Sequence, residues 1–105
     1  MAENKRYAVP AMIAFARDAF QAAGVPETDA AIAAKQFIEA DLTGFDAHGI
    51  FRLAPYVAQL KSGRVKAKAN IKVLQRAPSS ALGDGDDGIG PVVMNNSTKL
   101  AIELA

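Results

Sequence analysis

The chain has 105 residues, enough for one domain, and its 12 basic and 11 acidic residues almost balance. This balance argues against a nucleic-acid partner recruited by bulk charge. The absence of cysteine excludes disulfides and thiolate metal sites. No apolar run approaches the ~18 residues of a membrane span, and the first ten residues lack the apolar core of a signal peptide. We therefore expect a soluble, cytoplasmic protein with no membrane partner.

The first part of the sequence predicts two helices. Apolar residues recur at three- and four-residue steps after Pro10, which suits a first helical turn, and Gly24 ends that pattern. A second helix is predicted over 27–42, with acidic residues in its first turn and Gly44 as its C-terminal cap. Many apolar positions in both helices are alanines, which permit close contact but bury little area each.

A third helix is predicted to begin at Asp46, whose carboxylate can cap free backbone N–H groups. Pro55 lies inside this segment, where it marks either a kink or the first turn after a break. Two short helices, over 46–54 and 55–61, are therefore an alternative to one continuous helix. Gly63 ends the pattern in either case.

The remainder predicts short strands within 70–83, a turn or loop over 84–88, and a fourth helix opened by Pro91. The fold class is therefore α+β: an N-terminal helical bundle, a short β segment and the start of a further helix. We divide the chain into a helical domain, residues 1–66, and the beginning of a mixed-sheet domain, residues 67–105.

The only histidine, His48, lies four residues before Arg52. Histidine exchanges a proton near neutral pH, and arginine offers a fork of donors that fits a carboxylate. If a helix begins near Asp46, the two share one face, which would suit a 2-keto or 2-hydroxy acid. The alternative is a surface histidine and an arginine paired with Asp46. Asp41 either orients a neighbour such as His48 or is simply solvated.

Two further stretches each have a structural and a functional interpretation. The segment Gly83–Gly88 matches G-x-G-x-x-G, but its three aspartates favour a tight turn over a phosphate cradle. Residues 61–76 contain six basic residues and no acidic one. A solvated strand edge is the favoured interpretation of this stretch, and contact with a phosphate-bearing cofactor is the alternative.

Residues 37–56, FIEADLTGFDAHGIFRLAPY, resemble the N-terminal motif of the type-2 malate/L-lactate dehydrogenase family, with its pattern EAD-L-G-D-S-H-G-x-x-R-L-x-x-Y. Residues 84–93, DGDDGIGPVV, resemble the next motif of that family, which leads into a helix. The family also includes sulfolactate and ureidoglycolate dehydrogenases and cyclic-imine reductases. Its members are about three times longer, so the resemblance covers their N-terminal part only.

The resemblance implies an NAD(P)-dependent oxidoreductase acting on small 2-hydroxy acids or 2-keto/2-imino acids. It implies that His48 is the catalytic proton donor or acceptor, and that Arg52 binds the substrate carboxylate. Ala47 stands where many members have a serine that relays protons with the histidine, so the relay or the substrate differs here.

In that family a non-Rossmann domain, built from later sequence, holds most of the NAD or NADP. We therefore expect no turnover from these 105 residues alone. We also expect self-association, as a homodimer or through exposed apolar faces, and no nucleic-acid partner. The alternative is a small stand-alone helical interaction module without catalysis.

Overall fold

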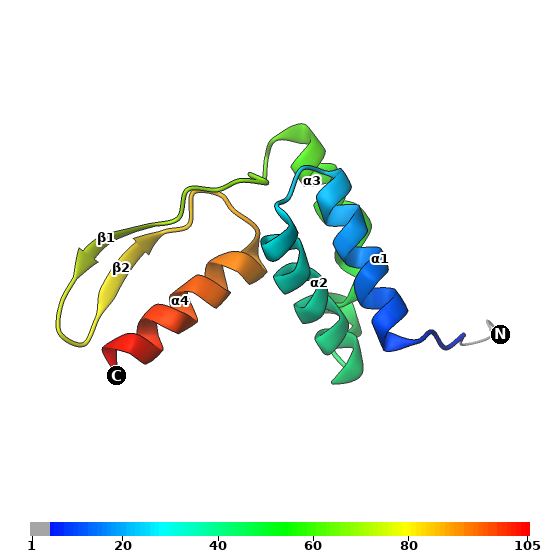
Figure 1. Cartoon of the computed structure of the whole chain (residues 1–105), viewed down its shortest axis with the longest axis horizontal. Helices are drawn as coiled ribbons and strands as arrows, with labels where there is room; N and C mark the ends of the chain where they lie inside the picture. Colours follow the sequence, from blue (N-terminus) through cyan, green and yellow to red (C-terminus); the bar gives the residue numbers. More distant parts are fainter. Residues whose placement is uncertain (1–4) are drawn as a thin grey trace.

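Three helices lie side by side in the first part of the molecule, whose computed structural model describes residues 5–105 (Figure 1). Helices α1 (Val9–Ala22) and α2 (Glu27–Leu42) form an antiparallel pair, and α3 (Leu53–Ser62) packs beside them. The predicted first two helices are confirmed. Gly24 and Gly44 follow them with positive φ angles, a backbone conformation that glycine adopts without steric cost.

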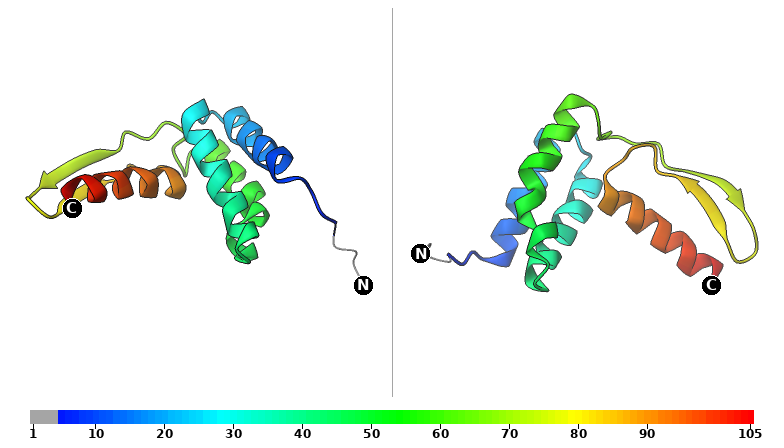
Figure 2. Two further views of the ribbon diagram at one scale, coloured as in Figure 1. Left: turned by 60° about the horizontal axis from the view of Figure 1, so that its bottom comes forward. Right: turned by 180° about the vertical axis from the view of Figure 1, so that it is seen from behind.

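A hairpin and a fourth helix extend away from the helical layer (Figure 2). Strands β1 (Lys72–Arg76) and β2 (Ala81–Asp84) pair antiparallel, with a bulge in β1 between Val73 and Gln75. Both strands are exposed along their whole length. Helix α4 (Gly90–Leu104) then returns alongside the hairpin. The predicted α+β class, with helices first and a short β segment after them, is confirmed.

The core lies between the helices and is built around one aromatic pair. Phe20 of α1 and Phe37 of α2 meet edge to face, with ring centroids 5.4 Å apart. Fully buried alanines beside them allow the two helices to approach closely. Ile89 and Val92 extend the same cluster to the start of α4. The beginning of α4 is therefore anchored on the helical layer, although the rest of it is not.

The predicted start of the third helix was wrong. Two 3-10 turns, η1 (Asp46–His48) and η2 (Ile50–Arg52), precede α3, and the Asp46 carboxylate caps neither η1 nor α3. The helical path breaks at Gly49, whose φ of −94° and ψ of −147° are not helical and which packs against Asp41 of α2. Pro55 falls in the first turn of α3, where its missing N–H group costs no hydrogen bond.

Among residues 5–105, no helix combines the length and the apolar character needed to cross a membrane.

Candidate active site

The segment from Phe45 to Arg52 forms the wall of the candidate site. It leaves α2 at Gly44 and makes two successive 3-10 turns, whose i to i+3 bonds tighten the chain. The N–H of His48 donates to the Phe45 carbonyl at 2.9 Å. The N–H of Arg52 donates to the Gly49 carbonyl at 2.9 Å. Each turn therefore presents one chemically useful side chain at its end.

His48 and Arg52 line the same groove, which has a volume of about 410 Å³. The groove runs between α2, the two turns, α3 and the start of α4, and its other lining residues are Gln36, Phe37, Ala40, Tyr56, Pro91 and Met94. The predicted meeting of the two side chains is therefore found, but not on one helical face. Two short turns bring them to a common groove instead.

The Arg52 guanidinium is held by the backbone of its own loop. Its Nε–H donates to the Ala47 carbonyl at 2.8 Å, which fixes the plane of the group. Arginine has five N–H donors, so the four on its terminal nitrogens remain available for an anion. The predicted alternative, an ion pair with Asp46, does not occur among the described residues. Arg52 therefore keeps the bidentate face that fits a carboxylate.

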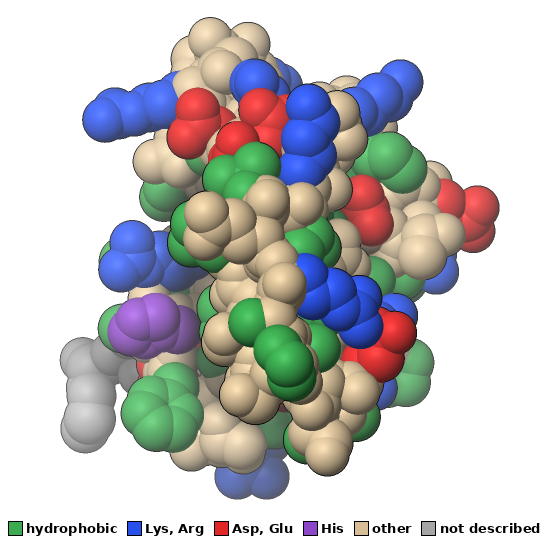
Figure 3. Space-filling view, turned by 90° about the vertical axis from the view of Figure 1, so that its left-hand side faces the viewer, with side chains coloured by type: hydrophobic (Ala, Val, Ile, Leu, Met, Phe, Trp, Pro, Cys, Tyr) green, Lys and Arg blue, Asp and Glu red, His purple; other side chains and the backbone are tan. Residues whose placement is uncertain are grey.

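His48 stands at the surface, where its ring has basic and hydrophobic side chains beside it (Figure 3). Within residues 5–105, neither of its ring nitrogens is hydrogen-bonded. Such an imidazole can take a proton from a bound molecule or give one to it.

Tyr56 is a groove residue for which the residue pattern alone predicted no role. It is half-buried and meets Phe37 edge to face, with centroids 5.2 Å apart. The two rings make one apolar side of the groove beside the polar pair. The available signal was its spacing: Tyr56 follows Arg52 by four residues, which is one helical turn.

Asp41 does not bond His48 but ties the two turns to α2. Its Oδ2 accepts the N–H of Ile50 at 2.8 Å. The two predicted alternatives for Asp41 were that it orients a neighbour such as His48 and that it is solvated. The structure favours the first, but the neighbour is Ile50 and not His48.

The glycine-rich turn does not fit the phosphates of a dinucleotide. Asp84 accepts the N–H of Asp86 at 2.8 Å, and Asp86 accepts both the Lys66 ammonium at 2.6 Å and the N–H of Asn70 at 2.8 Å. The lysine and the backbone N–H groups are already bonded to carboxylates, whose negative charge would repel a pyrophosphate. Gly83 and Asp84 end β2, and the rest of the segment up to Gly88 is a structural turn, in line with the tight turn that its composition favoured.

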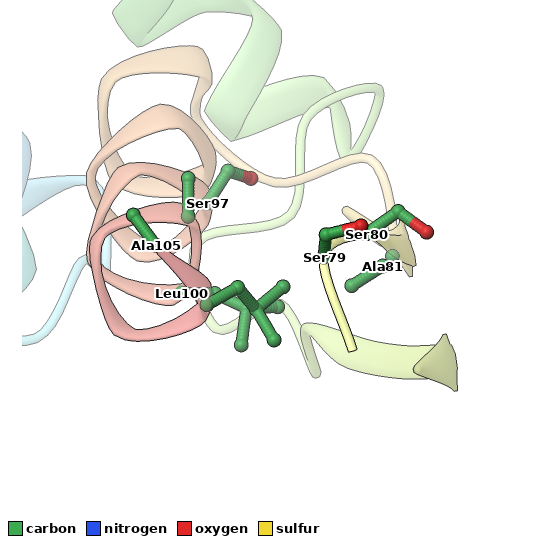
Figure 4. Close-up of a pocket in the computed structure, with 9 residues that line it drawn as sticks. Ser79, Ser80, Ala81, Ser97, Leu100 and Ala105 are labelled. Atoms are coloured by element: carbon green, nitrogen blue, oxygen red, sulfur yellow. The ribbon is translucent and has the colours of Figure 1, made fainter. Parts of the chain in front are cut away.

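A second hollow lies between the hairpin and α4 (Figure 4). It is lined by serine, alanine, glycine and leucine residues, among them Ser79, Ser97 and Leu100. No titratable side chain lines it, so it offers no acid, base or anion clamp. Nor do the described residues bring together three histidine or carboxylate side chains that could hold a metal ion.

Comparison with known proteins shows that the fold and sequence are similar to those of dehydrogenases. The structure superposes on malate dehydrogenase from Pyrococcus horikoshii with a TM-score of 0.94 and 42% identity, over 96% of this chain and 29% of that one. In sequence, the same enzyme is 49% identical over 82 residues, which are 78% of this chain and 23% of its own length.

Two further relatives have related names. L-sulfolactate dehydrogenase from Methanocaldococcus jannaschii is 44% identical over 88 residues, 84% of this chain and 26% of the relative. An NADP(+)-linked (2R)-3-sulfolactate dehydrogenase from Chromohalobacter salexigens is 36% identical over 87 residues, 83% of this chain and 26% of the relative.

The fold is therefore the one found in the N-terminal part of malate and sulfolactate dehydrogenases. The malate/L-lactate dehydrogenase family model matches residues 8–105. The chain belongs to this family, and it spans about a quarter of the length of the curated relatives that it matches.

Proposed function

We propose that the chain supplies the acid/base group and the carboxylate clamp of an NAD(P)-dependent oxidoreductase acting on small 2-hydroxy acids or 2-keto/2-imino acids. The observation that carries the proposal is the convergence of His48 and Arg52 on one groove, in a chain of this family. The names of the relatives, malate and sulfolactate dehydrogenases, support the substrate class.

Arg52 binds the substrate carboxylate through its terminal nitrogens, because its Nε–H is already engaged with the Ala47 carbonyl. The carboxylate then fixes the neighbouring carbon, C2, near His48. On oxidation of a 2-hydroxy acid, the imidazole takes the proton of the C2 hydroxyl. On reduction of a keto or imino acid, it returns a proton to the same oxygen or nitrogen.

NAD or NADP is the proposed partner in hydride transfer, and the name of one relative includes NADP(+). The glycine-rich turn does not fit its phosphates, so we assign its binding mainly to other parts of the parent protein. Catalysis needs the reacting carbon and the cofactor held in close register. We therefore propose that these 105 residues alone do not turn over substrate.

A titration with L-malate, followed by NMR at the Arg52 Nε–H and the His48 ring, tests the binding role. We expect saturable shifts at both groups, and Arg52→Ala should weaken malate at least ~10-fold, because hydrogen bonds to charged groups are worth about 1.5–3 kcal/mol. Arg52→Lys should retain part of the affinity, since it keeps the charge and loses the fork.

Arg64→Ala is the matched control, because it removes one exposed positive charge outside the groove. Malate affinity that falls equally in Arg52→Ala and Arg64→Ala would show a nonspecific charge effect. That result would overturn the assignment of Arg52 as the carboxylate clamp.

A further inference from the structure

Asp41 is a carboxylate that the proposed chemistry does not use, although it lies next to the loop that bears both proposed groups. It stands in the last turn of α2 and is half-buried. Its Oδ2 accepts the N–H of Ile50 at 2.8 Å, which joins positions nine residues apart. Ile50 opens the second of the two 3-10 turns, so the bond fixes where that turn begins.

Gly49 makes the same contact from the other side. A Cβ placed on Gly49 would lie 2.0 Å from Asp41 Oδ1 and 2.2 Å from its Cγ, far inside van der Waals contact. The residue is buried, and its φ of −94° lies outside the left-handed region that favours glycine. The lack of space beside Asp41 is therefore the feature that requires glycine here. Asp41 and Gly49 fit together as one unit.

This unit stands between the two groups of the proposed site. His48 immediately precedes Gly49, and the N–H of Arg52 bonds to the Gly49 carbonyl at 2.9 Å. The Arg52 Nε–H then reaches back to Ala47. A shift at Gly49 would therefore move the imidazole and the guanidinium relative to each other and to α2.

The Asp41 carboxylate has the Ile50 N–H as its hydrogen-bond partner and, within residues 5–105, forms no ion pair with the cations near it. On its other side the carboxylate borders a hollow that Lys5 and Arg6 also line. Neither of these cations comes within ion-pair distance of Asp41 in the described part of the chain. The backbone bond, and not a salt bridge, is what holds this side chain.

We propose that Asp41 is a positioning residue that, with Gly49, holds the two 3-10 turns so that His48 and Arg52 converge on the groove. The inference rests on the proposed function for the roles of His48 and Arg52. Asp41 itself does not line their groove and acts only through the loop.

The test compares Asp41→Ala with Asp41→Asn, which keeps an oxygen that can accept the Ile50 N–H. Asp46→Asn is the matched control, because it removes the same charge from an exposed residue of the same loop. Amide exchange at Ile50 and the NMR shift of the Arg52 Nε–H report the geometry. The dissociation constant of L-malate reports binding, and thermal melting reports the fold.

In Asp41→Ala we expect the Ile50 amide to lose protection, the Arg52 Nε–H to move toward its solvent-exposed shift, and malate to bind about 10-fold more weakly. Asp41→Asn should restore most of each value, and Asp46→Asn should match the unaltered chain. Unaltered Ile50 protection and Arg52 shift in Asp41→Ala would overturn the proposal. So would an Asp41→Asn variant that melts normally but has lost both signals.

Gly49→Ala gives a second route, of which the single variant and its pair with Asp41→Asn do not depend on the folding of Asp41→Ala. Alone it should displace the Arg52 signal, because the new methyl group collides with the carboxylate. In the double variant with Asp41→Asn the collision remains, because the side chain keeps its size. In the double variant with Asp41→Ala the collision is removed, so Gly49→Ala should cause no further displacement of the Arg52 signal. Purely additive effects in both pairs would overturn the coupling of Asp41 and Gly49.

The proposed function and this inference fail separately. If the unaltered chain binds no malate while Asp41→Ala still loses the Ile50 and Arg52 signals, Asp41 positions the loop and the proposed function falls. If malate binds and the signals do not depend on Asp41, the positioning role falls.

Discussion

Individual glycines set tight packing limits in this molecule, and Gly88 is the clearest case outside the candidate site. A Cβ on Gly88 would lie 2.7 Å from the Cβ of Ala69 and 3.1 Å from the Gly85 carbonyl oxygen. At Gly90, by comparison, the nearest atom to an added methyl group would be the Tyr56 hydroxyl at 3.7 Å, an ordinary contact. The two positions are only two residues apart but tolerate a side chain very differently.

Gly88→Ala is therefore expected to lower the free energy of unfolding by about 1–3 kcal/mol, the usual cost of overpacking. Gly90→Ala should cost less than Gly88→Ala: its methyl group makes only an ordinary contact with Tyr56, and the remaining cost comes from a residue with a Cβ adopting a helical conformation before Pro91. Urea denaturation of both variants measures the difference. Equal stabilities would show that the turn relaxes around the new methyl group without cost.

Some site residues could be predicted from the sequence and some could not. His48 and Arg52 stood out because a histidine and an arginine in one tight motif carry recognisable chemistry. Tyr56 did not, because an aromatic residue at helical spacing is typical of a core position. Its place in the groove depends on α4, whose Pro91 and Met94 line the same groove. Because this placement depends on an element far away in the sequence, the residues around Tyr56 do not predict it.

At the scale of elements, helices α1 and α2 could be predicted from the sequence, whereas the loop between α2 and α3 could not. Helices α1 and α2 follow from apolar periodicity and glycine stops, which are local signals. The two 3-10 turns depend on the bond between Asp41 and Ile50 across nine residues, so the sequence favoured a helix starting at Asp46. Pro55 suggested a break between residues 54 and 55, whereas the helical path breaks at Gly49 and α3 already begins at Leu53.

A polar clamp joins the segment before the hairpin to the turn that follows β2. Lys66 pairs with Asp86, and the bond from the Lys66 ammonium is the main cause that lowers the pKa of Asp86 below its ordinary 3.8. The N–H of Asn70 lowers that pKa further. The Asp86 carboxylate in turn raises the pKa of Lys66 above 10.5.

The clamp should therefore be intact at neutral pH and fail at both extremes. The part due to Asp86 is present above pH 3.8 and is lost as the pH falls through its lower folded-state pKa. The part due to Lys66 is present below pH 10.5 and is lost as the pH rises through its higher folded-state pKa.

The chemical shift of the Asn70 amide, followed in an acid titration, measures the first transition. Its midpoint should lie below 3.8 and should rise toward 3.8 in Lys66→Ala. Lys68→Ala is the control, because Lys68 makes no ion pair in the described residues and should leave the midpoint in place. A midpoint that is the same in both variants would contradict the clamp.

The whole molecule is extended for its length. Its radius of gyration is 15.3 Å, whereas about 13 Å is typical of a compact chain of about 100 residues. Its accessible surface is 7360 Å², above the roughly 5,600 Å² expected for a monomer of this mass. Several large hydrophobic side chains contribute to that surface, among them Phe15, Phe51 and Ile102. A stand-alone interaction module would bury more of them.

We therefore expect the 105-residue chain to self-associate through its exposed apolar faces. Sedimentation at several concentrations should show species heavier than 11.0 kDa. Replacing Phe15 and Phe51 with serine should shift the distribution toward the monomer, because both line one exposed apolar hollow beside α3. A single 11.0 kDa species that melts cooperatively would instead favour the interaction module.

The most direct test of the proposed function is malate oxidation by a chimera. Residues 8–105 would replace the matching segment of the Pyrococcus horikoshii malate dehydrogenase, onto which 96% of this chain superposes. We predict NAD(P)-linked turnover by the chimera, none by the 105-residue chain alone, and a loss of about 10²–10⁴ in kcat for His48→Ala in the chimera. Full turnover in the folded His48→Ala chimera would contradict the proposal.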